Sequence, residues 1–210
     1  MSAPGGSGLP GSVAGPGTTT PSVRPAGPDD ALCLGVLAPR VFLETYAPEG
    51  VRPALAREVL ATLSPAAFDA ALADPASRLF VAEHAPHRVG FVHLVLGAVP
   101  PGPPLAHPAE VLRLYVQAPQ AGAGLGTRLL ARAEAAAAAA GARHVWLTAW
   151  VGNLRARAFY AARGYADRGA ADHWIEGERF ENRLFVKALP AGAVADRTGD
   201  ADAPARTPAA

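Results

Sequence analysis

The sequence is poor in cysteine, methionine and lysine, with one residue of each type among 210. The single cysteine, Cys33, excludes an internal disulfide framework and a zinc site built from cysteines. Charged residues make up 18% of the chain, and 19 basic residues nearly balance 18 acidic ones. No basic stripe is present, so we expect no nucleic-acid partner.

Long runs of strongly apolar residues are also missing. The alanine tract at 135–140 is too weakly hydrophobic to span a bilayer, so we expect no membrane partner. The first residues lack both the charged region and the apolar region of a signal peptide. We therefore expect a cytoplasmic protein.

Glycine and proline are abundant, with 22 and 21 residues, but they concentrate at the two ends. Residues 1–21 and 190–210 hold much of this excess and almost no large apolar side chains, so we predict two disordered tails. The intervening residues 22–189 have the length and composition of a single domain with one core.

The order of predicted elements indicates a mixed α+β fold rather than an alternating parallel one. Pro39 predicts a kink or break in the first helix, which begins near Asp29 or Asp30. Alternation along 110–117 predicts that Val111 and Tyr115 share a face opposite Leu114. The predicted strands are 22–25, 79–83, 89–96, 110–117, 145–149 and a closing pair formed by 165 and 174–176 with 183–188. The predicted helices are about 30–46, 52–62, 65–72, 125–140 and 153–162.

A glycine-rich turn, Gly122-Ala123-Gly124-Leu125-Gly126, joins a predicted strand to a predicted helix. Backbone N–H groups at such a helix start favour phosphate binding. A tight turn without a ligand is the alternative. The spacing G-x-G-x-G, with no acid after the next strand, does not match a dinucleotide fold, and no lysine is near enough for a P-loop.

Asn153 and Tyr160 define a second pattern, N-x-x-A-x-x-F-Y-x-x-x-G-[FY], completed by Gly164 and Tyr165. Seven residues are two helical turns, so Asn153 and Tyr160 share a helix face. Together with the glycine turn about thirty residues earlier, this pattern resembles the acetyl-CoA-binding motifs of the GNAT superfamily of N-acetyltransferases. The resemblance covers about residues 23–189.

The resemblance implies a GNAT fold, with a mostly antiparallel sheet of six to seven strands and helices on both faces. It implies acetyl-CoA as cosubstrate, no metal, and direct attack of an amine on the thioester in a ternary complex. Tyr160 would protonate the leaving thiolate. The alternative is that Tyr160 is only a half-buried aromatic side chain of the helix. The implied acetyl-CoA-binding residues are Leu114, Tyr115, Val116, Gln117, Gly122, Ala123, Gly124, Leu125, Gly126, Thr127, Asn153 and Tyr160.

The phosphate loop departs from the family pattern at two positions. The family usually places Gln or Arg where this chain has Ala121, and often a basic residue where it has Ala123. Charge-assisted hydrogen bonds contribute about 1.5–3 kcal/mol each, so their loss predicts weaker CoA binding. Gln120 or Arg128 is a candidate to compensate.

An amine acceptor must lose a proton before it attacks, which requires a base or a water-mediated route. Glu110, at the start of the strand that leads to the glycine loop, is the first candidate; an ordinary strand-end acid is the alternative. His93 and His173 are weaker candidates. Cys33 is not expected to act, because direct transfer needs no cysteine nucleophile.

Two stretches, 146–150 before Asn153 and His173 with Gly177-Glu178 before the last strand, resemble bacterial GNAT enzymes of the spermidine/spermine type, which implies a small amine or polyamine acceptor. Acids that could receive such a cation are Glu44, Glu49, Glu110, Glu176, Glu178 and Glu181. Two other functions stay open, a silent acetyl-CoA-binding sensor and an acetyltransferase for peptide or protein amines. The proline-rich loop 99–108 is expected near the acceptor, and a homodimer is compatible with the sequence.

Overall fold

The computed structural model describes residues 20–190. Most of the two predicted tails therefore lies outside the described residues. Among residues 20–190, no helix has the length and apolar character needed to cross a membrane.

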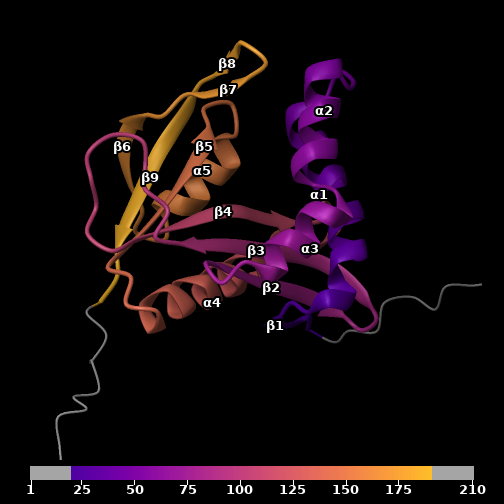
Figure 1. Ribbon diagram of the computed structural model, residues 1–210, viewed down its shortest axis with the longest axis horizontal. Coiled ribbons are helices and arrows are strands. Elements are labelled where there is room, and N and C mark those ends of the chain that lie inside the picture. Colours follow the sequence, from indigo (N-terminus) through magenta and orange to yellow (C-terminus); the bar gives the residue numbers. More distant parts are fainter. Residues whose placement is uncertain (1–19, 191–210) are drawn as a thin grey trace, which may run out of the picture.

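Seven strands form one sheet in the order β1-β2-β3-β4-β5-β9-β6 (Figure 1). All neighbours pair antiparallel except β4 and β5, which are parallel. The predicted mixed α+β, mostly antiparallel sheet is confirmed. The strands are β1 (Ser22–Pro25), β2 (Ser77–His84), β3 (His87–Leu96), β4 (Pro108–Val116), β5 (His144–Trp150), β6 (Ala166–Ala170) and β9 (Asn182–Ala188), and β7 (His173–Ile175) with β8 (Glu178–Phe180) form a separate hairpin.

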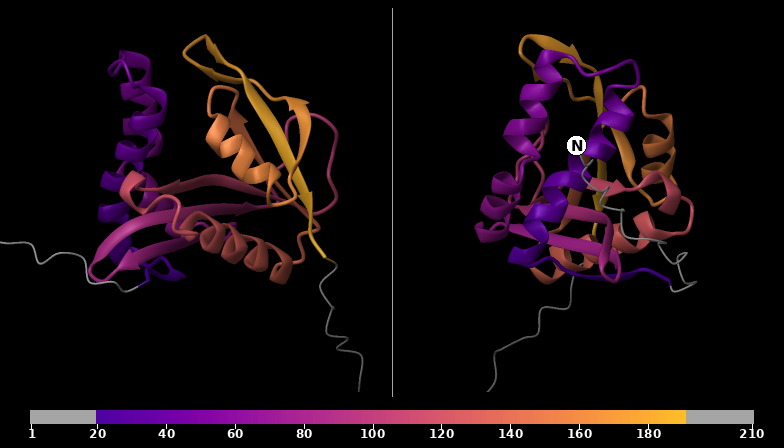
Figure 2. Two further views of the ribbon diagram at one scale, coloured as in Figure 1. Left: turned by 180° about the vertical axis from the view of Figure 1, so that it is seen from behind. Right: turned by 90° about the vertical axis from the view of Figure 1, so that its right-hand side faces the viewer.

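The parallel strands β4 and β5 are paired only over their first residues. Residues 108–110 of β4 pair with 144–146 of β5, and no pairing continues to the ends of the two strands. From this point β4 stays with β1–β3, while β5, β9 and β6 turn away as a second arm (Figure 2, left). The sheet is therefore splayed open along the second half of β4.

Helices cover both faces of the sheet. One face packs on α4 and α5, with Leu129, Ala133 and Tyr160 in the core, and the other packs on α1 and α3, with Leu34 and Phe68. The helices are α1 (Ala31–Tyr46), α2 (Pro53–Thr62), α3 (Pro65–Ala73), α4 (Leu125–Ala139) and α5 (Leu154–Ala161), with short 3₁₀ turns η1 (Pro28–Asp30) and η2 (Ala118–Gln120).

Of the kink or break predicted at Pro39, the break is wrong, because α1 continues through Pro39. Proline in a helix interior costs about 3 kcal/mol. Leu34, Leu37 and Ala38 are all buried around it, and each buried leucine contributes about 1.5–3 kcal/mol. Packing therefore outweighs the local cost of the missing hydrogen bond.

The predicted faces of β4 are also wrong, and the cause is a β-bulge. Arg113 lies opposite His93 of β3, but the next step pairs Val111 with Leu94, so Leu112 is an extra residue. The bulge reverses the alternation, and Val111 packs in the same core as Leu114 while Tyr115 packs on the α1 side.

The closing pair also differs from the prediction. β9 pairs with β6, residues 166–170, and the segment at 174–176 instead forms the β7–β8 hairpin. Both hairpin turn residues have positive φ, 49° at Glu176 and 83° at Gly177, as a type I′ turn requires. The proline-rich loop 99–108 was expected near the acceptor, but none of its residues lines the two cavities described below. Leu105 of the loop and the preceding Ala98 instead contact a small core that includes Trp146.

Candidate active site

A cavity of about 640 Å³, called the larger cavity below, lies in the opening between β4 and β5. Its volume is in the range of pockets that hold cofactors and other drug-sized ligands. Residues 112–116 of β4 face it without a β5 partner, so this edge can pair with an extended ligand. The implied binding residues that line it are Leu114, Tyr115, Val116, Gly122, Gly124, Gly126, Thr127, Asn153 and Tyr160.

The glycine turn forms one end of this cavity and leads into α4. Gly122 and Gly124 have φ of 92° and 76°, a left-handed conformation that side chains disfavour. Gly124 is the N-cap of α4 and has no side chain to cap the helix, so the first N–H groups of α4 lack an intrahelical acceptor. These N–H groups and the positive end of the helix dipole favour an anion here.

Three implied binding residues do not line the cavity with their side chains. The backbone N–H of Gln117 donates to the carbonyl of Val89 at 3.0 Å, which continues the β3–β4 pairing. Leu125 is buried in the main core under the helix start, and Ala123 is exposed on the loop.

Asn153 connects the cavity to the start of α5. It is the N-cap residue, and its Oδ1 accepts a hydrogen bond from the N–H of Ala156 at 3.0 Å. A side-chain amide has two further donor hydrogens on Nδ2. Asn153 can therefore cap α5 and donate to a ligand in the cavity at the same time.

Tyr160 lies on α5 and lines the cavity with 8% of its surface exposed. Its ring contacts Phe159, Tyr165 and Phe185, with centroids 5.2–6.2 Å apart. Burial raises the pKa of Tyr160 above its ordinary value, and the nearby phenol of Tyr46 acts in the same direction. The phenol therefore keeps its proton at neutral pH and can act as a donor.

Arg163 is a cavity residue that the sequence patterns did not single out. Its guanidinium donates to Oγ1 of Thr127 at the start of α4 and lies 3.6 Å from the ring centroid of Phe159. Neither proposed substitute for the missing polar contacts, Gln120 or Arg128, lines the cavity. Arg128 instead donates to the carbonyl of Pro21.

A smaller cavity of about 210 Å³ adjoins the larger one. The two share Tyr46, Leu112, Arg113, Tyr115 and Thr148, so they meet at the bulge of β4. The remaining residues come from α1, α2, β4, β7, β8 and β9. They are Phe42, Leu55, Glu58, Thr62, Leu63, Glu110, His173, Ile175, Phe180 and Asn182.

Glu110 and His173, two candidate bases, both line this smaller cavity. Burial raises the pKa of Glu110 to about 7, although the positive charge of Arg113 opposes the shift. A carboxyl group with this pKa exchanges its proton near neutral pH, which suits a general base. Glu58, on α2, is a second acid of this cavity that the sequence patterns did not identify.

His93 and Cys33 line neither cavity. His93 is buried in β3, where its Nε2 lies 3.0 Å from Oγ of Ser77. Burial lowers the pKa of His93 to about 4, so it is neutral at pH 7. Cys33 is exposed on α1. Among residues 20–190, no group of three His, Cys, Asp or Glu side chains is arranged to hold a metal ion.

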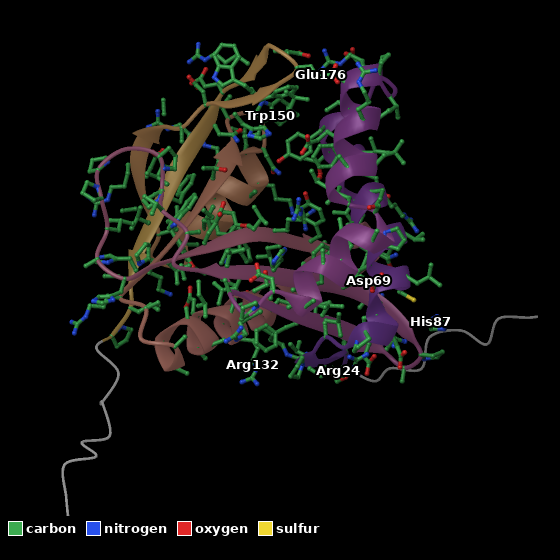
Figure 3. All side chains as sticks on the ribbon, in the orientation of Figure 1. Arg24, Asp69, His87, Arg132, Trp150 and Glu176 are labelled. Carbon is green, nitrogen blue, oxygen red and sulfur yellow. The ribbon has the colours of Figure 1, made fainter. Side chains whose placement is uncertain are left out.

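The β7–β8 hairpin reaches across to α2 beside the smaller cavity (Figure 3). Arg52 Nη1 pairs with Glu178 at 2.7 Å, and Arg57 pairs with Glu176 at the hairpin turn. Arg52 also lies 6.0 Å from the ring centroid of Phe180. We call these contacts the hairpin latch.

A splayed sheet with a glycine-rich helix start on one side and an amide and a phenol on the other is the architecture of acyl-CoA N-acyltransferases. The chain matches the family model "Acetyltransferase (GNAT) family" over residues 43–165. It is 32% identical over 160 residues to uncharacterized N-acetyltransferases of Mycobacterium bovis and Mycobacterium tuberculosis, covering 76% of this chain and 98% of each relative. The protein belongs to the GNAT acetyltransferase family, as the resemblance predicted.

Solved structures agree on the fold. The PaiA N-acetyltransferase of Thermoplasma acidophilum, solved with coenzyme A, aligns with a TM-score of 0.68 at 18% identity and covers 81% of this chain and all of its own. The yncA protein of Salmonella typhimurium, solved with acetyl-CoA, has a TM-score of 0.59 at 16% identity, with 85% and 99% covered.

Proposed function

We propose that this acetyltransferase moves the acetyl group of acetyl-CoA to the primary amine of a small acceptor that binds in the smaller cavity. The observation that carries the proposal is the junction of the two cavities at the β4 bulge, with Tyr160 on one side and Glu110 on the other. An acyl donor and an amine can meet there without a covalent enzyme intermediate.

The larger cavity fits acetyl-CoA on three grounds. Its unpaired β4 edge, residues 112–116, suits the amide-bearing pantetheine arm, and the start of α4 suits the pyrophosphate. Arg163 and Arg155 add positive charge to the lining where Ala121 and Ala123 supply none. PaiA and yncA, which were solved with coenzyme A and acetyl-CoA respectively, point to the same donor.

Glu110 would deprotonate the ammonium group of the acceptor. Most amines are protonated at neutral pH, and the attacking nitrogen needs a free electron pair. Glu110, or a water molecule held by it, accepts the ammonium proton, and its pKa of about 7 leaves a large ionised fraction at physiological pH. Ion pairing with Glu110 and Glu58 also attracts the ammonium group into the cavity.

In the transfer step the amine nitrogen bonds to the thioester carbonyl carbon and the carbon–sulfur bond breaks. Tyr160 donates its phenolic proton to the sulfur, and the second proton lost by the nitrogen passes to water, because Glu110 already holds the ammonium proton and returns it to solvent after the product leaves. Solvent reprotonates Tyr160 afterwards. The raised pKa of Tyr160 keeps the proton available until the thiolate develops.

A small acceptor is favoured over a peptide because the hairpin latch joins α2 to the β7–β8 hairpin beside the smaller cavity. The latch also occupies Glu176 and Glu178, two of the acids expected to receive a polyamine. The cytoplasmic location, the single domain at 22–189 and the homodimer stay predictions.

Release of free thiol from acetyl-CoA in the presence of an amine panel tests the proposal, with the acetylated product identified by mass spectrometry. The panel contains polyamines, aminoglycosides, amino acids, simple alkylamines and short peptides. Turnover of a small amine supports the proposal. Tight CoA binding without turnover of any amine would favour the sensor function, and turnover of peptides alone would favour a protein acetyltransferase.

A further inference from the structure

Arg113 is the residue of the smaller cavity whose charge the proposed chemistry does not use. It follows the bulge on β4, is partly buried and lines both cavities. Its charge acts on the phenol of Tyr115. Within residues 20–190 it forms no ion pair, whereas the partly buried Arg24 and Arg88 both pair with Asp30.

The partly buried guanidinium of Arg113 lies close enough to Glu110 to oppose the rise that burial causes in the pKa of that carboxyl, but it forms no close ion pair among residues 20–190. Removing such a charge from water is costly unless an anion compensates for it. The planar fork of arginine suits carboxylate and phosphonate groups, which it binds through two parallel hydrogen bonds. The position of Arg113 thus favours an anionic group on a ligand.

The other charges of the smaller cavity favour a ligand with a positive group as well. Glu58, Glu110 and His173 face the same space as Arg113. An ammonium group near Glu110 and an anionic group near Arg113 would complement both signs. The apolar walls, which include Leu55 and Phe180, suit a short hydrocarbon side chain between or beside the two charged ends.

The size of the cavity limits the ligand further. Pockets for drug-sized ligands measure about 300–1,000 Å³, and this one is about 210 Å³. A long polyamine has several positive groups and no anion for Arg113. A compact molecule that carries one amine and one acid group fits both the volume and the charges.

We propose that the acceptor is a small amino acid-like compound whose carboxylate or phosphonate binds Arg113 while its amine is acetylated. This inference rests on the proposed function, since it names the acceptor class of the same site. Arg113 also lines the larger cavity, so its alternative role is a general electrostatic effect on the donor thioester. The two roles predict different losses of kcat/KM on substitution of Arg113: an anion site affects only acceptors with an acid group, whereas an effect on the thioester is the same for every acceptor.

Matched acceptor pairs separate these roles. Leucine is compared with 3-methylbutylamine and phenylalanine with 2-phenylethylamine, since each pair differs by one carboxylate. For the wild type we expect kcat/KM about 10- to 100-fold higher for the acid-bearing member, the range of a charge-assisted interaction. R113Q should lower kcat/KM for the acid-bearing member of each pair about 10- to 100-fold more than for its simple-amine partner, with R113K restoring part of the difference. R168Q, on an exposed arginine of β6, is the control.

Equal loss for both members of each pair in R113Q would overturn the inference, as would a wild-type preference for the simple amines. Thermal unfolding of each variant shows whether it is folded. A non-catalytic measurement separates this inference from the proposed function: N-acetylleucine is compared with N-(3-methylbutyl)acetamide by calorimetric titration of the wild type and R113Q. Arginine-dependent binding of the acid without any turnover would support the anion site and reject the acetyltransferase proposal. Turnover without an arginine-dependent preference would support the acetyltransferase proposal and reject the anion site.

Discussion

The larger cavity contains an unpaired backbone edge and a helix start, whereas the charges of the smaller one come from side chains. The first uses the free edge of β4, the glycine turn and the start of α4, so its properties follow from conformation. The second gathers Glu58, Glu110, Arg113 and His173 from separate elements, so its properties follow from residue identity. We infer that the first recognises a constant donor and the second a particular acceptor.

The largest effect is expected from Tyr160→Phe, which removes the proton donor at the junction. General-acid catalysis contributes about 10²–10⁴-fold, so kcat should fall by that factor while the KM for acetyl-CoA changes little. Steady-state thiol release measures both. Tyr165→Phe is the control, because Tyr165 donates to Glu134 and lines neither cavity. An unchanged kcat in Tyr160→Phe would remove the general-acid role.

Glu110→Gln should lower kcat/KM by about 10²-fold at pH 8, since the acceptor would lose its base. In the wild type, kcat/KM should rise with pH through an inflection near 7, because the carboxyl group must be ionised to accept a proton. The variant should lack this inflection. A pH profile of kcat/KM that keeps the inflection in Glu110→Gln would assign it to another group.

The same carboxyl group makes folding depend on pH. Its folded pKa of about 7 exceeds the ordinary value of 4.5, so the folded state binds the proton more tightly than the unfolded state. The free energy of unfolding should therefore fall as pH rises from about 4.5 to 7, and Glu110→Gln should reduce this slope. Urea unfolding at pH 5 and pH 8 measures the difference.

Arg163→Ala tests whether a side chain supports the backbone phosphate site. Loss of a charge-assisted contact predicts a Kd for CoA about 10- to 100-fold higher by calorimetric titration. Arg128→Ala should change it less than twofold, because that side chain lies outside the cavity. With S-acetylpantetheine, which has no pyrophosphate, Arg163→Ala and the wild type should react equally. Equal loss with both donors would mean that Arg163 supports the fold rather than the phosphates.

The smallest effect is expected at the hairpin latch. Exposed ion pairs contribute about 0–1 kcal/mol, so the Arg52→Gln, Arg57→Gln double variant should raise the KM for the acceptor about two- to threefold. Added salt should raise the KM of the wild type more than that of the variant. Arg183→Gln breaks a similar pair between β9 and β6 and serves as the control. A salt response of equal size in the wild type and the double variant would exclude a contribution from the latch.

The contrast between the two cavities also explains how much of the site could be predicted from the sequence. The glycine turn and the Asn153–Tyr160 pair are local patterns, because helix and turn geometry fix the spacing of their residues. They were sufficient to predict the fold class and the parts of the larger cavity formed by the glycine turn, Asn153 and Tyr160. Arg163 was missed because its partner, Thr127, is 36 residues away in the chain.

The smaller cavity has no comparable local pattern. Glu58 and Arg113 come from different elements and meet only after the sheet has folded. The bulge at Leu112 also has no clear signal in the sequence, and it changes which β4 side chains face the acceptor. The hairpin was recognisable in principle, because Glu176-Gly177 between two short apolar-containing segments is a type I′ turn signal.

Initial rates measured over a grid of acetyl-CoA and acceptor concentrations test most directly the claim that both cavities are filled together. Direct transfer predicts double-reciprocal lines that intersect, and no acetyl group on the protein after incubation with acetyl-CoA alone. Parallel lines together with an acetylated enzyme would contradict the account, because they would require a covalent intermediate formed before the acceptor binds.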